Sequence, residues 1–129
     1  MRELSAELER VPHPALKSIH RELTSGFAAL AEATDWLLSA FQSDARTAMA
    51  GAVPYLKLFG TVTGGWLLAR SAVIAKARLD AGSKEHDFYR GKIATARFFA
   101  EHQLPLAQAL KSEIINGADS TLALDTHQF

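Results

Sequence analysis

The stretch that decides the fold is PYLKLFGTVTGGWLLAR, residues 54–70 of a chain of 129 residues. Three structures fit it at first sight: a phosphate-binding loop, a membrane span and one face of a buried helix. A phosphate loop places its glycines between a strand and a helix N-terminus, where backbone N–H groups point at one anion. Gly60, Gly64 and Gly65 lie instead inside a helical pattern and match neither G-x-G-x-x-G nor a G-K-[ST] ending. The pattern therefore disfavours a phosphate loop.

The membrane interpretation depends on the length of the apolar segment. A membrane span needs about 20 apolar residues, whereas Lys57 and Arg70 bracket about a dozen. We therefore interpret the stretch as a helix packed in the core. Gly60 and Gly64 share one helical face, and each costs the helix up to about 1 kcal/mol relative to alanine. We expect close approach of a neighbouring backbone or ring to compensate that cost.

Composition indicates an ordinary globular domain. A chain of this length can bury a core without disulfides or metal, and residues 1–129 are expected to form a single domain. Fourteen Lys and Arg balance fourteen Asp and Glu, so no net field draws the molecule to nucleic acid or an anionic membrane. The absence of cysteine excludes disulfides and thiolate chemistry. The N-terminal MRELSAELERVP lacks the apolar segment of a secretory signal, and a cytoplasmic location is expected.

Apolar residues recur every three or four positions along the whole chain, which predicts an all-α protein. We expect an up-down bundle of three long helices at about 14–42, 44–81 and 84–116, with short helices at 2–10 and near 120–124. Pro54 and Pro105 are expected to kink the second and third helices, because proline removes a backbone hydrogen bond. The core stripes should be Leu16, Ile19, Leu23, Phe27, Leu30, Ala33, Leu37 and Phe41; Ala52, Tyr55, Phe59, Val62, Trp66, Ala69, Val73 and Leu79; and Tyr89, Ile93, Ala96, Ala100, Gln103, Ala107, Leu110 and Ile114.

Capping residues support these boundaries. Pro14 suits a first helical position, and Ser43 or Asp44 can cap the second helix through a side-chain oxygen. Gly82 and the following serine supply a stop and a new cap, and the Asn-Gly pair at 116–117 ends the third helix.

The residues that usually carry chemistry form no recognisable constellation. The five histidines include no H-x-x-x-H pair, so no metal site is predicted. Glu101 and His102 are adjacent, and adjacent helical residues do not face each other, so we interpret them as a solvated or partly buried pair. Aromatic residues at helical spacing are expected in the core rather than around a ligand; they are Phe59, Trp66, Phe98 and Phe99. We predict no catalytic, cofactor-binding or metal-binding residue in this chain.

A basic segment surrounds the turn at Gly82. Seven basic residues stand against three acidic ones between positions 70 and 97: Arg70, Lys76, Arg78, Lys84, Arg90, Lys92 and Arg97. Such a tip could meet a phosphate-bearing ligand, a nucleic acid or an acidic partner. A solvated hairpin end is the favoured interpretation, because interleaved aromatic residues and a wider basic stripe are missing.

The segments GAVPYLKLFGTVTGGWLLARSA (51–72), FYRGKIATARFFAEHQLP (88–105) and GADS (117–120) resemble a known family. It is the C-terminal helical domain of one subset of bacterial acyl-CoA dehydrogenases, the group that includes 3-methylmercaptopropionyl-CoA dehydrogenase. The resemblance runs from about Leu16 to Leu124. It implies a parent enzyme that oxidises an acyl-CoA to its enoyl-CoA, with FAD as hydride acceptor and a carboxylate as base. In that family the flavin pocket and the base lie in the preceding dehydrogenase core, so none of that machinery is expected in this chain.

Two main hypotheses follow. The first is an accessory domain, non-catalytic by itself, that packs on a dehydrogenase core or its dimer; an apolar patch should then be exposed on the isolated chain. The alternative is a stand-alone interaction or dimerisation module in which Ala96, Ala100 and Ala107 let another helix approach closely. Nucleic-acid binding through the basic tip is less expected, because the total charge is neutral, and no membrane partner is expected.

Overall fold

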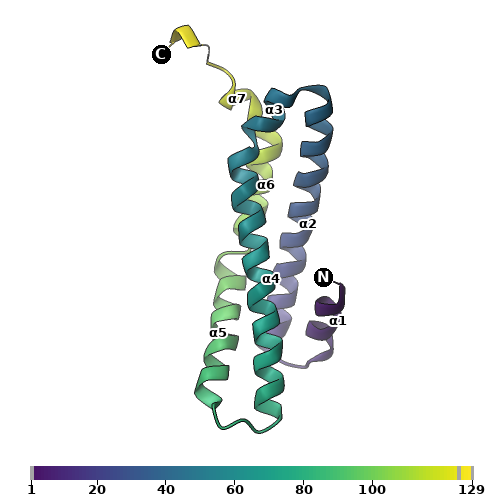
Figure 1. The fold of residues 1–129 in the computed structure, drawn as a ribbon, viewed down its shortest axis with the longest axis vertical. Helices are drawn as coiled ribbons and strands as arrows, with labels where there is room; N and C mark the ends of the chain where they lie inside the picture. The colour runs from purple at the N-terminus through teal and green to yellow at the C-terminus, as the bar shows by residue number, and fades with distance from the viewer. Residues whose placement is uncertain (1, 125, 129) are drawn as a thin grey trace.

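The structure is a computed structural model that describes residues 2–124 and 126–128. Its elements are α1 (Arg2–Arg10), α2 (Pro14–Ser43), α3 (Ala45–Ala50), α4 (Ala52–Asp80), α5 (His86–His102), α6 (Leu106–Asn116), α7 (Ala118–Thr121) and the 3-10 turn η1 (Thr126–Gln128). These residues contain no strand. The long helices α2 and α4 run antiparallel along the molecule, while α5 and α6 follow each other as a third column (Figure 1). The predicted all-α, up-down bundle is confirmed.

Two of the three predicted long helices are each divided in two. The first break falls at Gly51, so Pro54 is the third residue of α4, a position whose N–H has no intrahelical acceptor in any helix. The second break lies between α5 and α6, where the N–H groups of Gln103 and Leu104 both bond to the carbonyl of Phe99. Pro105 then begins α6 as its N-cap. Each proline therefore sits at the start of a new helix rather than inside a continuous one.

The core consists of two clusters stacked along the bundle. One joins α1, α2, α4 and α5 around Leu8, Leu16 and Ile19. The other joins α2, α4 and α6 around Leu58 and Ile114. Full burial of each such side chain stabilises the fold by about 1.5–3 kcal/mol. Alanines on α4 and α5 keep these two helices close together in the first cluster.

The core stripes are predicted well for α5 and α6 and less well for α2 and α4. Phe41, Ala52 and Phe59 were expected inside and are exposed, whereas Leu58 and Gly65 are buried on α4. The reason is that α4 is apolar nearly all round, so the period of its apolar residues does not single out one face.

Most helix boundaries agree with the capping signals, but the N-cap of α5 is Glu85 and not the predicted serine at position 83. Asp44 is the residue that caps α3, since its carboxylate accepts hydrogen bonds from the Arg46 N–H at 3.0 Å and the Thr47 hydroxyl at 2.6 Å. These bonds, the Thr47 bond first, lower the pKa of Asp44. Gly82 follows α4 with a φ of 76°. The short C-terminal helix occupies residues 118–121 rather than 120–124, and residue 125 lies outside the described part of the chain.

The argument that the apolar segment around residues 58–69 is too short to span a membrane is wrong for helix α4 as the structure shows it. By length and composition it is apolar enough to cross a membrane, since an 18-residue window within it satisfies that test. Core helices of soluble proteins pass the same test, and one third of this window is buried against other helices of the chain. The remaining apolar surface of α4 therefore needs another explanation.

Candidate functional site

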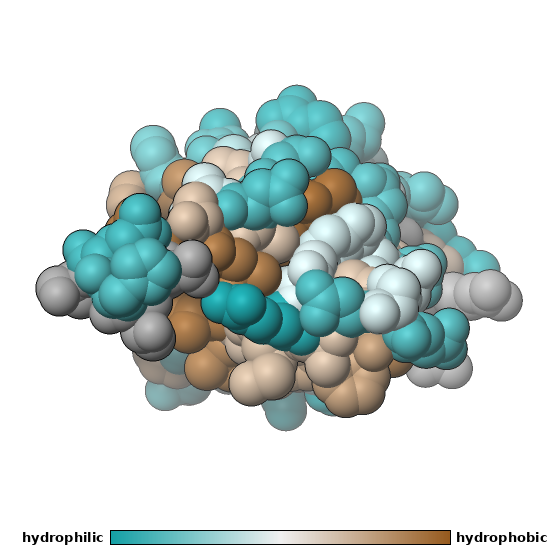
Figure 2. Space-filling view, turned by 90° about the horizontal axis from the view of Figure 1, so that it is seen from above, coloured by the Kyte–Doolittle hydropathy of each residue, from teal (hydrophilic) through white to brown (hydrophobic). Residues whose placement is uncertain are grey.

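The most prominent surface feature is a group of exposed apolar side chains. An apolar groove of about 310 Å³ lies at the end of the bundle where α2, α3 and α4 meet. Its lining includes Leu38, Phe41 and Met49, which are 62%, 62% and 70% exposed. Figure 2 looks down on this end and shows apolar residues reaching the surface between hydrophilic ones. The exposed apolar patch expected for an accessory domain is present.

The outward face of α4 continues this surface along the bundle. Val53, Leu56, Gly60, Thr63 and Leu67 follow one another at alternating steps of three and four, and Ile74 lies two turns beyond Leu67; we call these six residues the α4 strip. Thr63 is partly exposed and the other five are exposed. The spacing was visible in the sequence as a second apolar repeat on the same helix, on the face opposite the buried one. Sequence reasoning missed it because it looked for one core stripe per helix.

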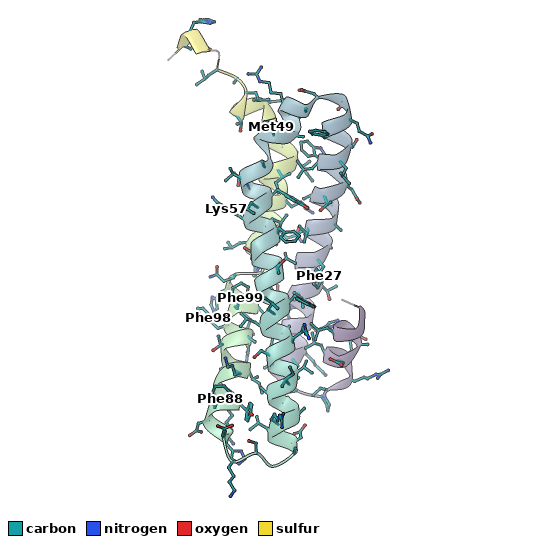
Figure 3. The ribbon with its side chains drawn as sticks, viewed as in Figure 1. Phe27, Met49, Lys57, Phe88, Phe98 and Phe99 are labelled. Carbon is teal, nitrogen blue, oxygen red and sulfur yellow. The ribbon has the colours of Figure 1, made fainter. Side chains whose placement is uncertain are left out.

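The three glycines of the opening stretch have different neighbours. A Cβ added at Gly65 would lie 2.8 Å from a methyl carbon of Leu104, and one at Gly64 would lie 3.4 Å from the ring of Phe99. Figure 3 shows Phe99 on the side of α5 that faces α4. The close packing predicted at Gly64 is confirmed. The same prediction for Gly60 is wrong, because a Cβ there would meet nothing within 4 Å.

A second groove, of about 390 Å³, lies between α4 and α5 near the other end of the strip. Leu67, Ile74 and Phe88 line it together with two cations. The Arg70 guanidinium lies 5.0 Å from the centre of the Trp66 ring, and the Lys92 ammonium lies 5.3 Å from the centre of the Phe88 ring. This groove is therefore apolar at its base and positively charged at its edges.

Some of the basic residues around the Gly82 turn form ion pairs within the chain. Lys76 pairs with Asp80 one turn away, and Arg97 pairs with Glu101. Arg78, Lys84 and Arg90 are exposed. The tip is thus partly neutralised, which weakens the case for a concentrated anion site there.

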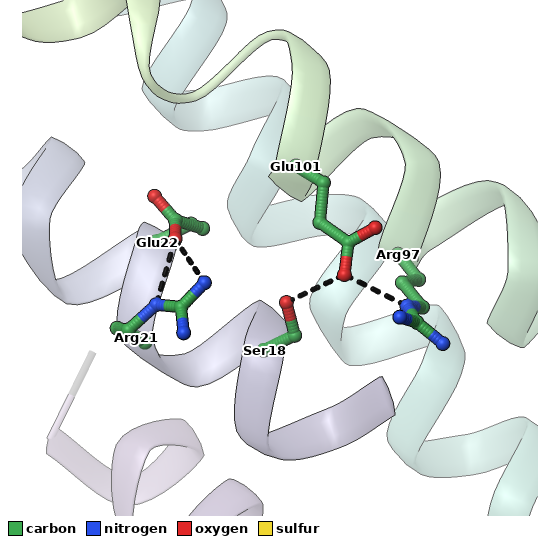
Figure 4. Close-up of polar contacts among 5 residues, drawn as sticks. All are labelled: Ser18, Arg21, Glu22, Arg97 and Glu101. Carbon is green, nitrogen blue, oxygen red and sulfur yellow. Dashed lines mark hydrogen bonds and ion pairs between the residues drawn. The ribbon is translucent and has the colours of Figure 1, made fainter. Parts of the chain in front are cut away.

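Glu101, which directly precedes His102 in the sequence, holds two helices together. Its Oε1 accepts hydrogen bonds from the Arg97 Nε and from the Ser18 hydroxyl of α2, both at 2.8 Å (Figure 4). The Arg97 bond first, and then the Ser18 bond, lower the pKa of Glu101. The neighbouring His102 is exposed, and its ring centre lies 4.5 Å from that of Phe98. The geometry joins α2 to α5 and does not form an acid-base pair.

The four aromatic residues assigned to the core divide into two pairs. Trp66 and Phe99 are partly buried and pack on the first core cluster. Phe59 and Phe98 are 49% and 60% exposed, so their assignment to the core is wrong. Three alanines expected to allow close approach of another helix are buried within the chain, each at most 2% exposed: Ala96, Ala100 and Ala107. They do not offer the close-approach surface that a dimerisation module would need.

The described residues do not fit a flavin. None of the buried ones is polar or charged, whereas an enclosed isoalloxazine ring needs hydrogen-bond partners for its polar edge. The two grooves are open and mostly apolar. Within the part of the chain that the structure describes, no three His, Asp or Glu side chains gather as metal ligands do.

These features define a helical domain with exposed apolar side chains and two surface grooves. The chain matches the family described as "Acetyl-CoA dehydrogenase C-terminal like" over residues 1–125, and it belongs to that family. The family resemblance seen in the sequence is confirmed.

Two similar proteins are acyl-CoA dehydrogenases. 3-methylmercaptopropionyl-CoA dehydrogenase of Ruegeria pomeroyi is 39% identical over 108 residues, which are 84% of this chain and 18% of that protein. Broad-specificity linear acyl-CoA dehydrogenase FadE5 of Mycobacterium tuberculosis is 41% identical over 81 residues, which are 61% of this chain and 13% of that protein. The chain thus spans less than a fifth of the length of the curated relatives it matches.

Proposed function

We propose that these residues form the C-terminal accessory domain of a flavin-dependent acyl-CoA dehydrogenase. The observation that carries the proposal is the family match over residues 1–125, in a chain that corresponds to only 18% of a relative's length. The domain packs on the dehydrogenase core or on the dimer of that core and performs no chemical step itself. We place the enzyme in the cytoplasm, in fatty acid metabolism, as a homo-oligomer.

The burial pattern supports this division of labour, since none of the residues that the structure describes as buried is polar or charged. In the proposed enzyme, FAD bound in the dehydrogenase core accepts the hydride as an acyl-CoA becomes an enoyl-CoA. The residues of this chain support that core by covering part of its surface. Their exposed apolar side chains would pack against that core, since monomeric proteins rarely leave large apolar patches uncovered.

The test is to recover the native assembly, meaning the polypeptide or complex that holds these residues in source cells. Antibodies raised against the 129-residue chain would detect it on an immunoblot and capture it for flavin and acyl-CoA oxidation assays. We expect a band several times larger than this chain, with bound flavin and acyl-CoA dehydrogenase activity. A band of the size of this chain that is captured free of any flavoprotein would overturn the proposal.

A further inference from the structure

We propose that the α4 strip is the surface that docks on the dehydrogenase core, and that its occupant is a core helix whose apolar face is edged by carboxylates. The inference rests on the proposed function and deepens it. It assigns the contact to one face of one helix and states the chemistry of the partner surface.

The first support is the exposure of the strip. Val53, Leu56 and Leu67 are 64%, 71% and 53% exposed, while the opposite face of α4 is buried against α2, α5 and α6. A helix that is apolar on all sides is normally covered on all sides. Within this chain α4 is covered on one side.

The second support is Gly60. This glycine lies at the middle of the strip, and a Cβ added there would meet nothing within 4 Å. Its cost to the helix is not compensated by any packing within the described chain, unlike that of Gly64 or Gly65. A glycine in an apolar helix face leaves a notch that lets a second helix approach closely. The partner of this notch lies outside the chain.

The third support is the geometry of the surface. From Val53 to Ile74 the strip extends for about 32 Å at 1.5 Å per residue, the length of a partner helix of about 20 residues. One groove adjoins each end of it. In Figure 3, Met49 of the first groove lies near the start of α4 and Phe88 of the second lies toward its other end. An extended, slightly oblique helix fits this surface better than a compact ligand does.

The positive charges beside the α4 strip indicate which kind of partner helix binds there. Lys57, Arg70 and Arg78 accompany the strip on α4 and Lys92 borders it on α5, while the acidic residue of α4 is Asp80 at its end. A second copy of this chain would bring the same cations against these. A helix edged by Asp or Glu would neutralise them, and complementary charges of this kind also fix register. The relatives contain more than four-fifths of their length outside the matched segment, so a core of the required size is available in such enzymes.

Site-specific labelling tests the assignment. The chain has no cysteine, so Leu67→Cys in the strip and Phe98→Cys outside it each introduce one thiol, at positions 53% and 60% exposed. Maleimide labelling is read at each residue by peptide mass spectrometry, in the isolated chain and in the native assembly. We expect both thiols to react at similar rates in the isolated chain. In the native assembly Leu67→Cys should react at least about tenfold more slowly, with Phe98→Cys nearly unchanged.

A pair of glycine variants separates docking from folding. Gly60 and Gly91 are both exposed, within helices, and without neighbours for an added Cβ. Leucine at either position should therefore leave the melting temperature of the isolated chain unchanged or raise it by a few degrees. In the native assembly Gly60→Leu should restore fast labelling of Leu67→Cys because it fills the notch. Gly91→Leu should not.

The outcomes distinguish the inference from the function on which it rests. If the native assembly contains a dehydrogenase yet Leu67→Cys reacts as fast as in the isolated chain, the domain docks by another face and the inference is wrong. Protection that appears in the isolated chain at high concentration, and is lost on dilution, would identify a second copy as the occupant instead. Protection by anionic vesicles, with none in the native assembly, would identify a lipid surface and equally overturn the inference.

Discussion

Gly65 shows how one missing side chain shapes the junction between the two halves of the third column. It lies where α4 passes the break between α5 and α6, and Leu104 occupies the space that a Cβ would fill. Leu104 is 2% exposed and cannot move aside into solvent. We expect Gly65→Ala to destabilise the fold by about 1–3 kcal/mol through overpacking, less the small gain in helix propensity.

Urea unfolding of the wild type and the variant checks this prediction. Gly60→Ala, five residues away on the same helix, is the matched control because its Cβ enters open space. It should stabilise the isolated chain by up to about 1 kcal/mol. Equal effects of the two substitutions would show that propensity, and not contact with Leu104, decides the outcome.

A second prediction at the residue scale concerns the pH dependence produced by Glu101. Hydrogen bonds from Arg97 and Ser18 hold its pKa below the ordinary 4.5, so the folded state favours the ionised carboxylate. This contribution to stability is present above pH 4.5 and is lost as the pH falls through the lowered value. Glu101→Gln should therefore melt at a lower temperature than the wild type at neutral pH, and the difference should vanish in acid.

Thermal melts followed by circular dichroism between about pH 3 and pH 7 check the sign. Ser18→Ala removes one of the two bonds and should give a smaller change in the same direction. A constant difference between wild type and Glu101→Gln across that range would mean that the carboxylate charge has no part in the α2–α5 contact.

At the scale of elements, the turn between α4 and α5 depends on its glycine. Gly82 has a φ of 76°; its N–H bonds to the Leu79 carbonyl, and the Ser83 N–H bonds to the Arg78 carbonyl. Together they close α4 in a Schellman motif. Gly82→Ala should cost about 1–2 kcal/mol because a left-handed conformation strains any residue with a Cβ. Denaturant unfolding measures it, and Gly91→Ala, which has an ordinary helical backbone, should be neutral or stabilising.

The elements themselves were largely predictable from local signals. The capping residues around 44, 82 and 117 and the period of the apolar residues gave the helices and their order, because these signals act over a few residues. The helix breaks at Gly51 and near Gln103 were harder to predict from the sequence. Proline marks a local loss of a hydrogen bond but does not say whether the helix bends or restarts, since that depends on how the neighbouring helices pack.

The buried face of α4 was the part of the fold that sequence alone could not select. Both of its faces are apolar, so Phe59 and Leu58 are equally suitable for a core on grounds of composition. The structure separates them, with Leu58 fully buried and Phe59 49% exposed. For the same reason the sequence alone did not reveal the candidate functional surface. The α4 strip lies on the face of α4 that remains exposed after α2, α5 and α6 have packed against the other face.

At the scale of the whole molecule, the exposed apolar surface should govern how the isolated chain behaves. Leu56 and Leu67, on either side of Gly60 in the strip, are both more than half exposed. The isolated chain should bind a dye that fluoresces on apolar surfaces and should self-associate weakly as its concentration rises. Replacing both leucines by aspartate should remove most of the dye fluorescence while leaving the melting temperature nearly unchanged, because neither side chain belongs to a core cluster.

Phe98→Asp is the control for this prediction, since Phe98 is 60% exposed on α5 and not on α4, and its replacement should leave most of the fluorescence. Dye titration and sedimentation velocity of the wild type, the double variant and Phe98→Asp give the comparison. The native assembly should bind little dye, because the core covers the strip. If the double variant fluoresces as strongly as the wild type, the dye reports another surface, such as the Phe98 and His102 pair on α5. The strip would then lose its place as the dominant uncovered face of the domain.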